Sequence, residues 1–455
     1  MTSRVEVARC EGATPGAAVF LLVWFGQVVS LLGSGLTGFA LGVWVYQKTG
    51  SATQLSVIAV CSRLPGILIL PVAGALVDRW DRRVTMIFTD LGAGASILCM
   101  ALLMFAGRLA LWHICLAVAV NSALSAFQWP AYVASTTLMV PKKHFGRVSG
   151  LVTASDAIAQ TVSPLLGAAL MIWIKIEGIF LADFASFLFS AVTLLAVKFP
   201  TLVKTNESRR LGASLLKEVA YGWTYVSSRP GLLALLSFFA CTNFFSGYVL
   251  VLITPLVLSF APPQVLGTVL SVGGIGLLIG SLLMSAWGGP KRRMKGVFVF
   301  QTLCGFFIIL AGLTASGKTI AIAAFAFFFC VPLIAGCSQA IWQSKVPPDV
   351  QGRVFAVRRM VAWSSVPLAY LSAGPLADYF FGPLLVSGGP LAGSIGRLTG
   401  VGPGRGIGFL FILMGMATVI LVGAGYLYPR LRLLEDELAD AIPVMTPAAG
   451  LAHGV

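Results

Sequence analysis

The sequence predicts an all-α membrane protein whose helices form two related bundles, and three observations lead to this prediction. The 455-residue chain is 58% hydrophobic and only 10% charged, with a mean hydropathy of +0.92, whereas soluble proteins carry charge on about a quarter of their residues. Its apolar residues gather in runs of about 20 residues or more, the length that crosses ~30 Å of hydrocarbon. A pattern of residues in the first half recurs in the second. We therefore expect about twelve membrane-spanning helices in two pseudo-symmetric six-helix bundles.

The expected spans follow one another along the chain as separate apolar runs. They cover residues 17–46, 52–77, 84–106, 109–135, 148–174 and 177–198 in the first half, and 231–259, 264–287, 297–315, 319–342, 351–379 and 406–428 in the second. Each run is continuously apolar, whereas the strands of a membrane barrel alternate over about ten residues. The spans are therefore helices.

The polar stretches between the runs divide the chain into domains. We expect an N-terminal tail (1–16), a first bundle (17–198), a linker (199–230), a second bundle (231–429) with an external loop insert (380–405), and a C-terminal tail (430–455). In the linker, apolar residues at helical spacing predict an amphipathic helix on the inner membrane surface; they are Leu211, Leu215, Leu216, Val219, Trp223 and Val226. The insert is rich in glycine and proline, so we expect a disordered connector, or else a partial cover of the outer mouth.

The distribution of lysine and arginine predicts the orientation. With the N-terminus inside, most of the 31 basic residues fall on the inner side, and the few outer ones are Lys48, Arg108, Lys175, Lys318, Arg397 and Arg405. Because cytoplasmic loops are enriched in these residues, both termini of this multi-pass cell membrane protein should be cytoplasmic. The same bias explains the net charge of +15 without nucleic acid as a partner.

A charged turn joins the second and third spans. Residues 74–83 read Gly-Ala-Leu-Val-Asp-Arg-Trp-Asp-Arg-Arg, and a basic pair without the acid recurs at Arg292 and Arg293. A second pattern, Val-Pro followed five residues later by Gly-Arg-Val, occurs at 140–148 and again at 346–354. Each proline ends one helix, and each arginine falls in the first turn of the next, at the level of the lipid headgroups.

These motifs resemble the signature loops of the major facilitator superfamily, and Asp81, where many members have glycine, is similar to its macrolide-efflux and enterobactin-exporter branch of drug/proton antiporters. The resemblance implies an efflux transporter that works by alternating access, with a proton as coupling ion, a small-molecule substrate and no cofactor. It also implies a gating motif on the inner side, whose residues are Gly74, Asp78, Arg79, Arg82, Arg83, Arg353, Arg358 and Arg359. That branch often has an acid in the middle of span 1, where this chain reads Leu-Gly-Ser-Gly-Leu at 32–36.

Charged residues inside the spans are the candidates for chemistry, because an ionisable group in hydrocarbon is costly unless it faces a cavity or a partner. They are Arg63, Asp90, Asp156, Asp183, Arg358, Arg359 and Asp378. Asp156, with Gln160 one turn later, and Asp90, six residues into span 3, are the expected proton-coupling carboxyls, with helix pairing as the alternative for each. Asp183 is expected to cap span 6 or to form an ion pair on the outer side.

Polar side chains in mid-span are the expected substrate contacts. They are Gln27, Asn121, Gln128, Asn243, Gln339 and Gln343. Aromatic residues such as Trp24, Trp129, Phe244 and Phe245 lie near them in sequence. A site with many aromatic and few hydrogen-bonding groups suits an amphipathic molecule better than a sugar, although packing between helices is an alternative for every one of these residues.

Other functions find less support in the sequence. The string Gly312 to Thr319 matches a P-loop, but it joins two membrane spans on the outer side, where nucleotide is absent. The eight cysteines and three histidines show no metal-ligand spacing, and no nucleophile motif points to an enzyme. Open alternatives are a siderophore exporter or a lysolipid flippase of the same fold, and a sensor or scaffold that transports nothing. A monomer in contact with membrane lipid is expected.

Overall fold

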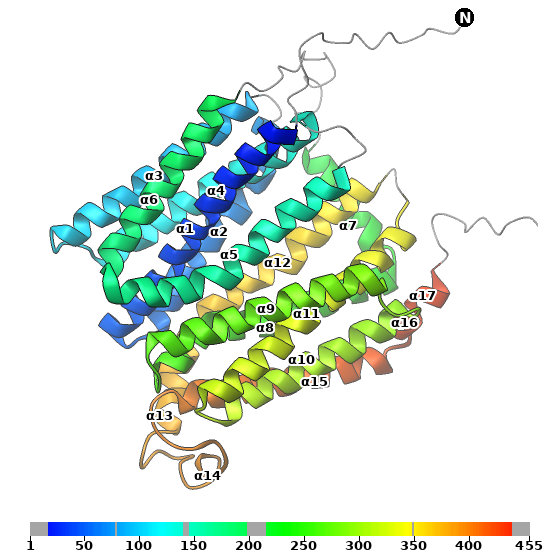
Figure 1. The fold of residues 1–455 in the computed structure, drawn as a ribbon. Coiled ribbons are helices and arrows are strands. Elements are labelled where there is room, and N and C mark those ends of the chain that lie inside the picture. The colour runs from blue at the N-terminus through cyan, green and yellow to red at the C-terminus, as the bar shows by residue number, and fades with distance from the viewer. Residues whose placement is uncertain (1–16, 78–79, 140–144, 198–214, 348–349, 439–455) are drawn as a thin grey trace, which may run out of the picture.

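The computed structural model describes residues 17–77, 80–139, 145–197, 215–347 and 350–438. In these residues, long helices follow one another with short turns between them (Figure 1). Eleven of the helices are long and apolar enough to cross a membrane. A further long helix, α12 (Gln351–Pro375), carries Arg353, Arg358 and Arg359 in its first half and is less apolar. The prediction of an all-α fold with about twelve spans is confirmed.

The long helices form two sets of six. The N-terminal bundle consists of α1 (Ala17–Thr49), α2 (Ala52–Val77), α3 (Arg82–Phe105), α4 (Leu111–Met139), α5 (Phe145–Trp173) and α6 (Lys175–Ala196). The C-terminal bundle consists of α8 (Pro230–Leu258), α9 (Pro263–Trp287), α10 (Arg293–Leu313), α11 (Gly317–Lys345), α12 and α15 (Arg405–Leu427). Shorter elements are α7 (Leu215–Ser227), the π-helix η4 (Leu376–Phe381), α13 (Gly382–Leu384), α14 (Gly396–Thr399), α16 (Pro429–Arg432) and α17 (Leu434–Glu437).

The two bundles repeat one packing scheme, as the duplicated motif predicts. In the first, α1 packs on α5 and α6, α3 packs on α4 and α6, and α2 packs on α4. In the second, α8 packs on α12 and α15, α10 packs on α11 and α15, and α9 packs on α11. Each of these five helix pairs of the first bundle thus has its counterpart six spans later. Parallel repeats of this kind, related by an axis along the membrane normal, are a recurring design of secondary transporters.

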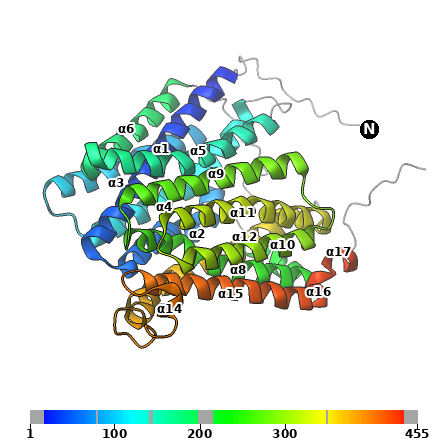
Figure 2. The same ribbon diagram turned by 60° about the horizontal axis from the view of Figure 1, so that its bottom comes forward.

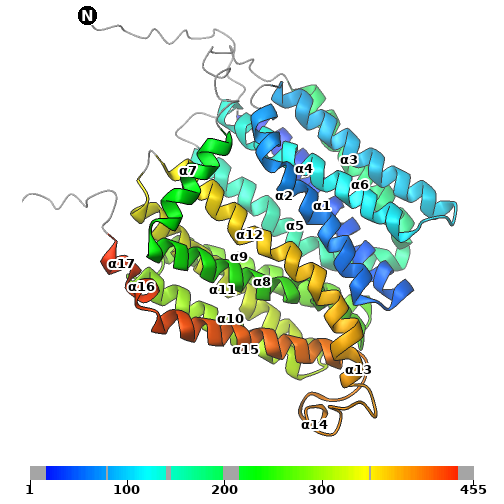
Figure 3. The same ribbon diagram turned by 180° about the vertical axis from the view of Figure 1, so that it is seen from behind.

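The bundles meet through two helix pairs that the same symmetry relates, α5 with α9 and α2 with α12. We call the end of the molecule at which α7 lies the linker end, and the opposite end, where α13 and α14 lie, the far end (Figures 1 and 3). Close contacts between the bundles occur in the far half. A Cβ added to Gly267 of α9 would lie 2.7 Å from Pro164 O of α5, and one added to Gly374 of α12 would lie 2.9 Å from Ala52 O of α2.

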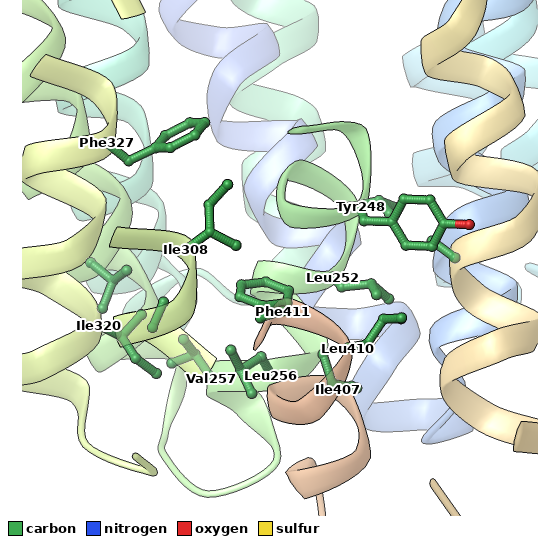
Figure 4. Packing of buried hydrophobic residues seen from close by; sticks show 14 of the residues in the cluster. Tyr248, Leu252, Leu256, Val257, Ile308, Ile320, Phe327, Ile407, Leu410 and Phe411 are labelled. Carbon is green, nitrogen blue, oxygen red and sulfur yellow. The ribbon is translucent and has the colours of Figure 1, made fainter. Parts of the chain in front are cut away.

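Each bundle has its own apolar core. In the second, Figure 4 shows Phe411 of α15 packed among Ile308 of α10 and Leu252 and Leu256 of α8, all of them buried. Because lipid is as apolar as such a core, helices in membranes gain stability from close packing, which small residues allow. Gly276 of α9 shows this, since a Cβ there would collide with a backbone carbonyl of α11.

The linker helix α7 packs on the start of α12. Its Gly222 lies against the backbone of Arg353, so that an added Cβ would be 2.6 Å from the carbonyl oxygen. The Arg353 guanidinium lies over the Tyr221 ring at 5.4 Å, and Val226 is fully buried. A helix is therefore present in the linker, as predicted, and it packs on the C-terminal bundle. Leu211 lies outside the described residues, and the position of this helix on the inner membrane surface stays a prediction.

The glycine-rich insert differs from the disordered connector expected from its composition. It folds into turns and two short helices at the far end (Figure 2), around the fully buried Leu385. Arg405, at the start of α15, is 5% exposed and donates a hydrogen bond from Nη1 to Thr399 O at 2.7 Å. This buried guanidinium attaches the insert to the start of α15, a specific contact that composition does not encode.

Candidate coupling and substrate site

Four helices of the N-terminal bundle bring polar side chains to one buried carboxylate. Asp90 of α3 is fully buried. Its Oδ1 accepts a hydrogen bond from Gln128 Nε2 of α4 at 2.5 Å, and its Oδ2 accepts one from Ser190 Oγ of α6 at 2.7 Å and a longer one from Gln27 Nε2 of α1 at 3.3 Å. The same Gln27 amide nitrogen donates to Ser190 Oγ at 2.7 Å, and Gln128 Nε2 reaches Gln27 Oε1 at 3.1 Å. We call these four residues the Asp90 network.

The Asp90 network joins residues that the sequence placed in separate groups. Asp90 was expected as a coupling carboxyl, and Gln27 and Gln128 were expected as substrate contacts. Ser190 was not among the candidates, because a lone serine in an apolar helix carries no signal of its own. A carboxylate that accepts several hydrogen bonds has its negative charge spread over its donors, so a proton or a ligand that binds there changes the contacts of all four helices.

Asp156 of α5, the other expected coupling carboxyl, lies apart from this network. Its side chain is half-buried and lies near Tyr132 of α4, whose hydroxyl is buried without a hydrogen-bond partner. Gln160, one turn further along α5, is exposed. The two residues predicted to form a polar pair on this helix thus differ in exposure, since Asp156 is half-buried and Gln160 is exposed.

Asp183 is not the outer helix cap or ion-pair partner that its place in the sequence suggested. It lies well inside α6, which begins at Lys175, and it is 1% exposed. Its neighbours are hydroxyl groups of Ser34, Thr37 and Ser186. The expectation was wrong because α6 begins eight residues before Asp183, which places Asp183 in the third turn of the helix.

The remaining predicted substrate contacts are engaged within their own bundles. Asn121 donates to Ser96 Oγ at 2.8 Å, linking α4 to α3. Asn243 donates to Ala362 O at 2.8 Å, linking α8 to α12. Gln343 is exposed in the last turn of α11, which ends at Lys345, and so does not lie in mid-span.

The last of these residues, Gln339, meets a residue of the predicted gating motif. Its Oε1 accepts a hydrogen bond from Arg358 Nη1 at 2.8 Å, and Arg358 Nη2 donates to Ser338 Oγ at 3.1 Å. The same guanidinium lies over the Trp342 ring at 5.3 Å. Arg358 thus ties α12 to α11 inside the C-terminal bundle.

Other members of the gating motif have local partners, and some lie outside the described residues. Arg83 donates from Nε to Leu194 O at 2.9 Å and from Nη2 to Leu195 O at 2.7 Å, so it caps the end of α6. Arg359 is exposed on α12. Arg82 lies in the first turn of α3 and Gly74 near the end of α2. Asp78 and Arg79 lie outside the described residues, so their expected contact with α12 stays a prediction.

Asp81 has a structural role that the motif alone did not reveal. Its Oδ1 accepts hydrogen bonds from the backbone N–H groups of Arg83 at 2.9 Å and Val84 at 3.2 Å, so it is the N-cap of α3. Aspartate is a preferred N-cap because its carboxylate satisfies the free N–H groups of a helix start.

Asp378, one of the charged residues inside the expected spans, lies at the far end, where it joins the two bundles. The Asp378 carboxylate, in η4 after α12, receives hydrogen bonds from the first turn of α2: Oδ1 from Ala52 N at 3.1 Å, and Oδ2 from Thr53 N at 2.8 Å and Ser51 Oγ at 2.7 Å. These hydrogen bonds join the two bundles. Asp378 was on the list of charges within spans, but nothing in the sequence indicated a partner some 325 residues earlier.

Comparison with known proteins agrees with this architecture. The model of the Major Facilitator Superfamily matches residues 23–371. Macrolide efflux protein A of Streptococcus pyogenes is 28% identical over 364 residues, which cover 79% of this chain and 89% of that protein. The multidrug efflux pump Tap of Mycolicibacterium fortuitum is 27% identical over 372 residues, again 79% of this chain and 89% of the relative.

Solved structures share the fold. A bacterial homolog of the human lysosomal transporter Spinster, in its inward-facing and unoccupied conformation, superimposes with a TM-score of 0.68 at 13% identity, covering 92% of this chain and 98% of that one. The nucleoside transporter NupG superimposes with a TM-score of 0.66 at 10% identity. The chain belongs to the major facilitator superfamily. It is a multi-pass membrane transporter, distantly related to drug efflux pumps, and its family consists of transporters and not of enzymes.

Proposed function

We propose that the protein exports a small amphipathic molecule in exchange for protons, by alternating access between its two bundles. The observation that carries the proposal is the Asp90 network, a buried carboxylate held by three other helices of one bundle. A secondary transporter needs a group whose occupancy by the coupling ion changes the shape of a bundle. Asp90 is suited to this role, because a proton on one of its oxygens turns an acceptor into a donor, either opposite Gln128 at Oδ1 or opposite Ser190 and Gln27 at Oδ2.

The proposed orientation places the linker end in the cytoplasm. The basic residues on that side, such as Arg82, Arg83 and Arg353, support this orientation through the positive-inside rule. The bundles hold each other at the far end through Asp378 and the start of α2. With the linker end inside, this contact closes the outer side, and the conformation is inward-facing.

The chemistry of the spans supports an amphipathic substrate. Of the polar side chains expected to contact substrate, Asn121, Asn243 and Gln339 each form a hydrogen bond inside their own bundle. Such side chains have fewer hydrogen bonds to offer a transported molecule, so a sugar, which needs many, would be held poorly. The names of the efflux relatives, one of which exports macrolides, suggest a macrolide as the first probe.

The test uses the full chain reconstituted in vesicles that contain a pH-sensitive dye. A macrolide gradient should drive proton movement in the opposite direction, and an imposed pH gradient should concentrate the macrolide. Asp90→Asn should lose both effects while exchange of macrolide down its own gradient continues. Asp156→Asn tests the other predicted carboxyl in the same way.

The matched control is Asp436→Asn, which removes an exposed carboxylate at the linker end, outside the spans. It should behave as the unmodified protein does. Export that continues against a gradient in both Asp90→Asn and Asp156→Asn would overturn the coupling sites. A driving force from a sodium gradient, with no response to pH, would overturn proton exchange.

A further inference from the structure

A second buried carboxyl lies between α6 and α1, apart from the Asp90 network. The Asp183 side chain is 1% exposed, and its Oδ2 is buried without a hydrogen-bond partner. The hydroxyl oxygen of Thr37, on the facing side of α1, is also buried without a partner. The two oxygens are neighbours without a hydrogen bond between them in this conformation. An anionic carboxyl oxygen buried in this way is costly, and a bound proton removes its charge.

The local backbone leaves room for this carboxyl. A Cβ added to Gly33 of α1 would lie 2.7 Å from Asp183 Oδ1 and would also collide with Ser186 Oγ. Ser186 donates to its own helix at Asp183 O, at 2.7 Å, and weakly to Asp183 Oδ1, at 3.4 Å. The absence of a side chain at Gly33 therefore opens the space into which Asp183 points.

No basic side chain on the neighbouring helices balances the Asp183 charge within the described residues. On α1, Lys48 lies in the last turn, over the Trp44 ring. On α3, Arg83 binds carbonyl groups at the other end of α6. The basic residue of α6 itself, Lys175, is its first residue and exposed.

The other charged groups near this position are acidic or distant. Arg82 lies with Arg83 in the first turn of α3, at the linker end. Glu177 is in the first turn of α6, and Asp156 of α5 lies beside Tyr132. A carboxylate in hydrocarbon needs a counter-charge or a proton. Because the described residues supply no counter-charge to Asp183, a bound proton is what stabilises it.

Asp183 shares a polar face of α6 with the Asp90 network. The buried residues Asp183, Ser186, Ser190 and Thr193 recur at intervals of three and four, so they lie on one side of the helix. Ser190, two turns or about 10.5 Å beyond Asp183, donates to Asp90 Oδ2 at 2.7 Å. Asp183 is nearer the far end and Asp90 nearer the linker end, so the two carboxyls stand at two depths of one bundle.

We propose that Asp183 is a second proton-binding carboxyl and that the polar face of α6 connects it with Asp90. This inference rests on the proposed proton coupling. A proton that binds Asp183 Oδ2 forms an O–H bond there. That bond breaks as the proton passes through bridging water to the Ser190 hydroxyl, whose own proton moves to Asp90 Oδ2. Asp183 is then a carboxylate again, and Asp90 is a carboxylic acid. The proton would then cross the N-terminal bundle by a path separate from that of the substrate between the bundles.

The first experiment measures proton binding directly, without transport. Infrared titration of the purified protein should show absorption bands of protonated carboxyl groups that change with pH, and Asp183→Asn should remove one that Asp90→Asn leaves in place. An unchanged titration in Asp183→Asn would overturn the assignment. Loss of that band on addition of sodium at constant pH would assign the site to a metal cation instead, and would overturn it as well.

The second experiment measures coupling in vesicles. Asp183→Asn should lower accumulation driven by a pH gradient at least about tenfold, since a positioned proton-transfer group is worth roughly 10² or more in rate, while macrolide exchange without a gradient is kept. Asp183→Glu should restore part of the accumulation. Gly33→Ala, which fills the space beside the carboxyl, should reproduce the defect.

The matched control for crowding is Gly35→Ala. Its added methyl would meet the hydroxyl of Ser163 on α5 as closely as one at Gly33 would meet Ser186, but on the other side of α1. It should leave coupling intact. Full coupling in Asp183→Asn, in vesicles where the unmodified protein couples, would overturn the proton path alone. A lack of coupling in the unmodified protein would overturn the proposed function, and the infrared result would then decide whether Asp183 binds a proton.

Discussion

Asp378 binds Thr53 twice, through the backbone N–H at 2.8 Å and through the side-chain hydroxyl at 2.7 Å. The carboxylate belongs to the C-terminal bundle, and it does for α2 of the N-terminal bundle what an N-cap residue does for its own helix. A helix start carries a partial positive charge, which adds to the attraction. This contact is a latch between the bundles, and it must break before the far end can open.

Removing the latch should favour the state that is open at the far end. We expect Asp378→Ala, which removes the acceptor oxygens, to cost about 1 kcal/mol, the usual worth of an N-cap, and to shift the ratio of the two states about fivefold. Pulsed EPR between spin labels at Lys48 and Gln264, both exposed at the far end, would measure the longer distances. The distance distribution of Asp436→Ala serves as reference, and an identical distribution in Asp378→Ala would contradict the latch.

The N-cap role of Asp81 predicts a loss of stability. Asp81→Ala should destabilise the start of α3 by roughly 0.5–2 kcal/mol, because the N–H groups of Arg83 and Val84 lose their acceptor. Asp81→Asn keeps an acceptor oxygen and should be milder. Thermal unfolding in detergent would rank the three proteins, and equal midpoints for Asp81→Ala and the unmodified protein would refute the cap.

Arg358 has two alternative roles: it is part of the gate at the linker end, or it is a structural link between α11 and α12. Arg358 donates hydrogen bonds to Gln339 and Ser338, so Arg358→Met should lower the free energy of unfolding and with it the unfolding temperature. The expected loss is about 1.5–3 kcal/mol, the usual contribution of hydrogen bonds to a charged group. Arg359→Met, which alters an exposed neighbour on the same helix, is the control. If Arg358→Met unfolds at the usual temperature and only transport is lost, the gate is the better description.

The expected gate at the linker end centres on Asp78. By its motif it should hold that end shut in the outward-open state, so Asp78→Asn should favour the inward-open state and reduce transport, with expression near normal. Transport rates in reconstituted vesicles, normalised to the inserted protein, are the measurement. Rates that match the unmodified protein would speak against a gate at this position.

Orientation can be tested with cysteines introduced on the two sides. In intact cells, Lys48→Cys should react with a membrane-impermeant thiol reagent, and Lys204→Cys in the linker should react only after permeabilisation. A background without the exposed native cysteines Cys99 and Cys241 keeps the signal specific. The reverse pattern of labelling would place the linker end outside.

The sequence by itself determined the class of fold, the number of spans and the repeat. These are local properties, since an apolar run long enough to cross a bilayer must become a helix to satisfy its backbone, and a duplicated motif implies a duplicated bundle. It also selected Asp90, Gln27 and Gln128 one by one, because polar groups in an apolar helix stand out.

Only the tertiary structure decided which of these residues meet. The Asp90 network draws on α1, α3, α4 and α6, and the latch joins Thr53 to Asp378, contacts that depend on how helices pack and not on neighbouring residues. Asp183 is the clearest example of a residue whose surroundings could not be predicted from the sequence. Its sequence position suggested a helix end, but the early start of α6 and the space beside Gly33 bury it against α1. Helix register and close packing are set by the shapes of both partners, so a single span does not reveal its neighbour's side chains.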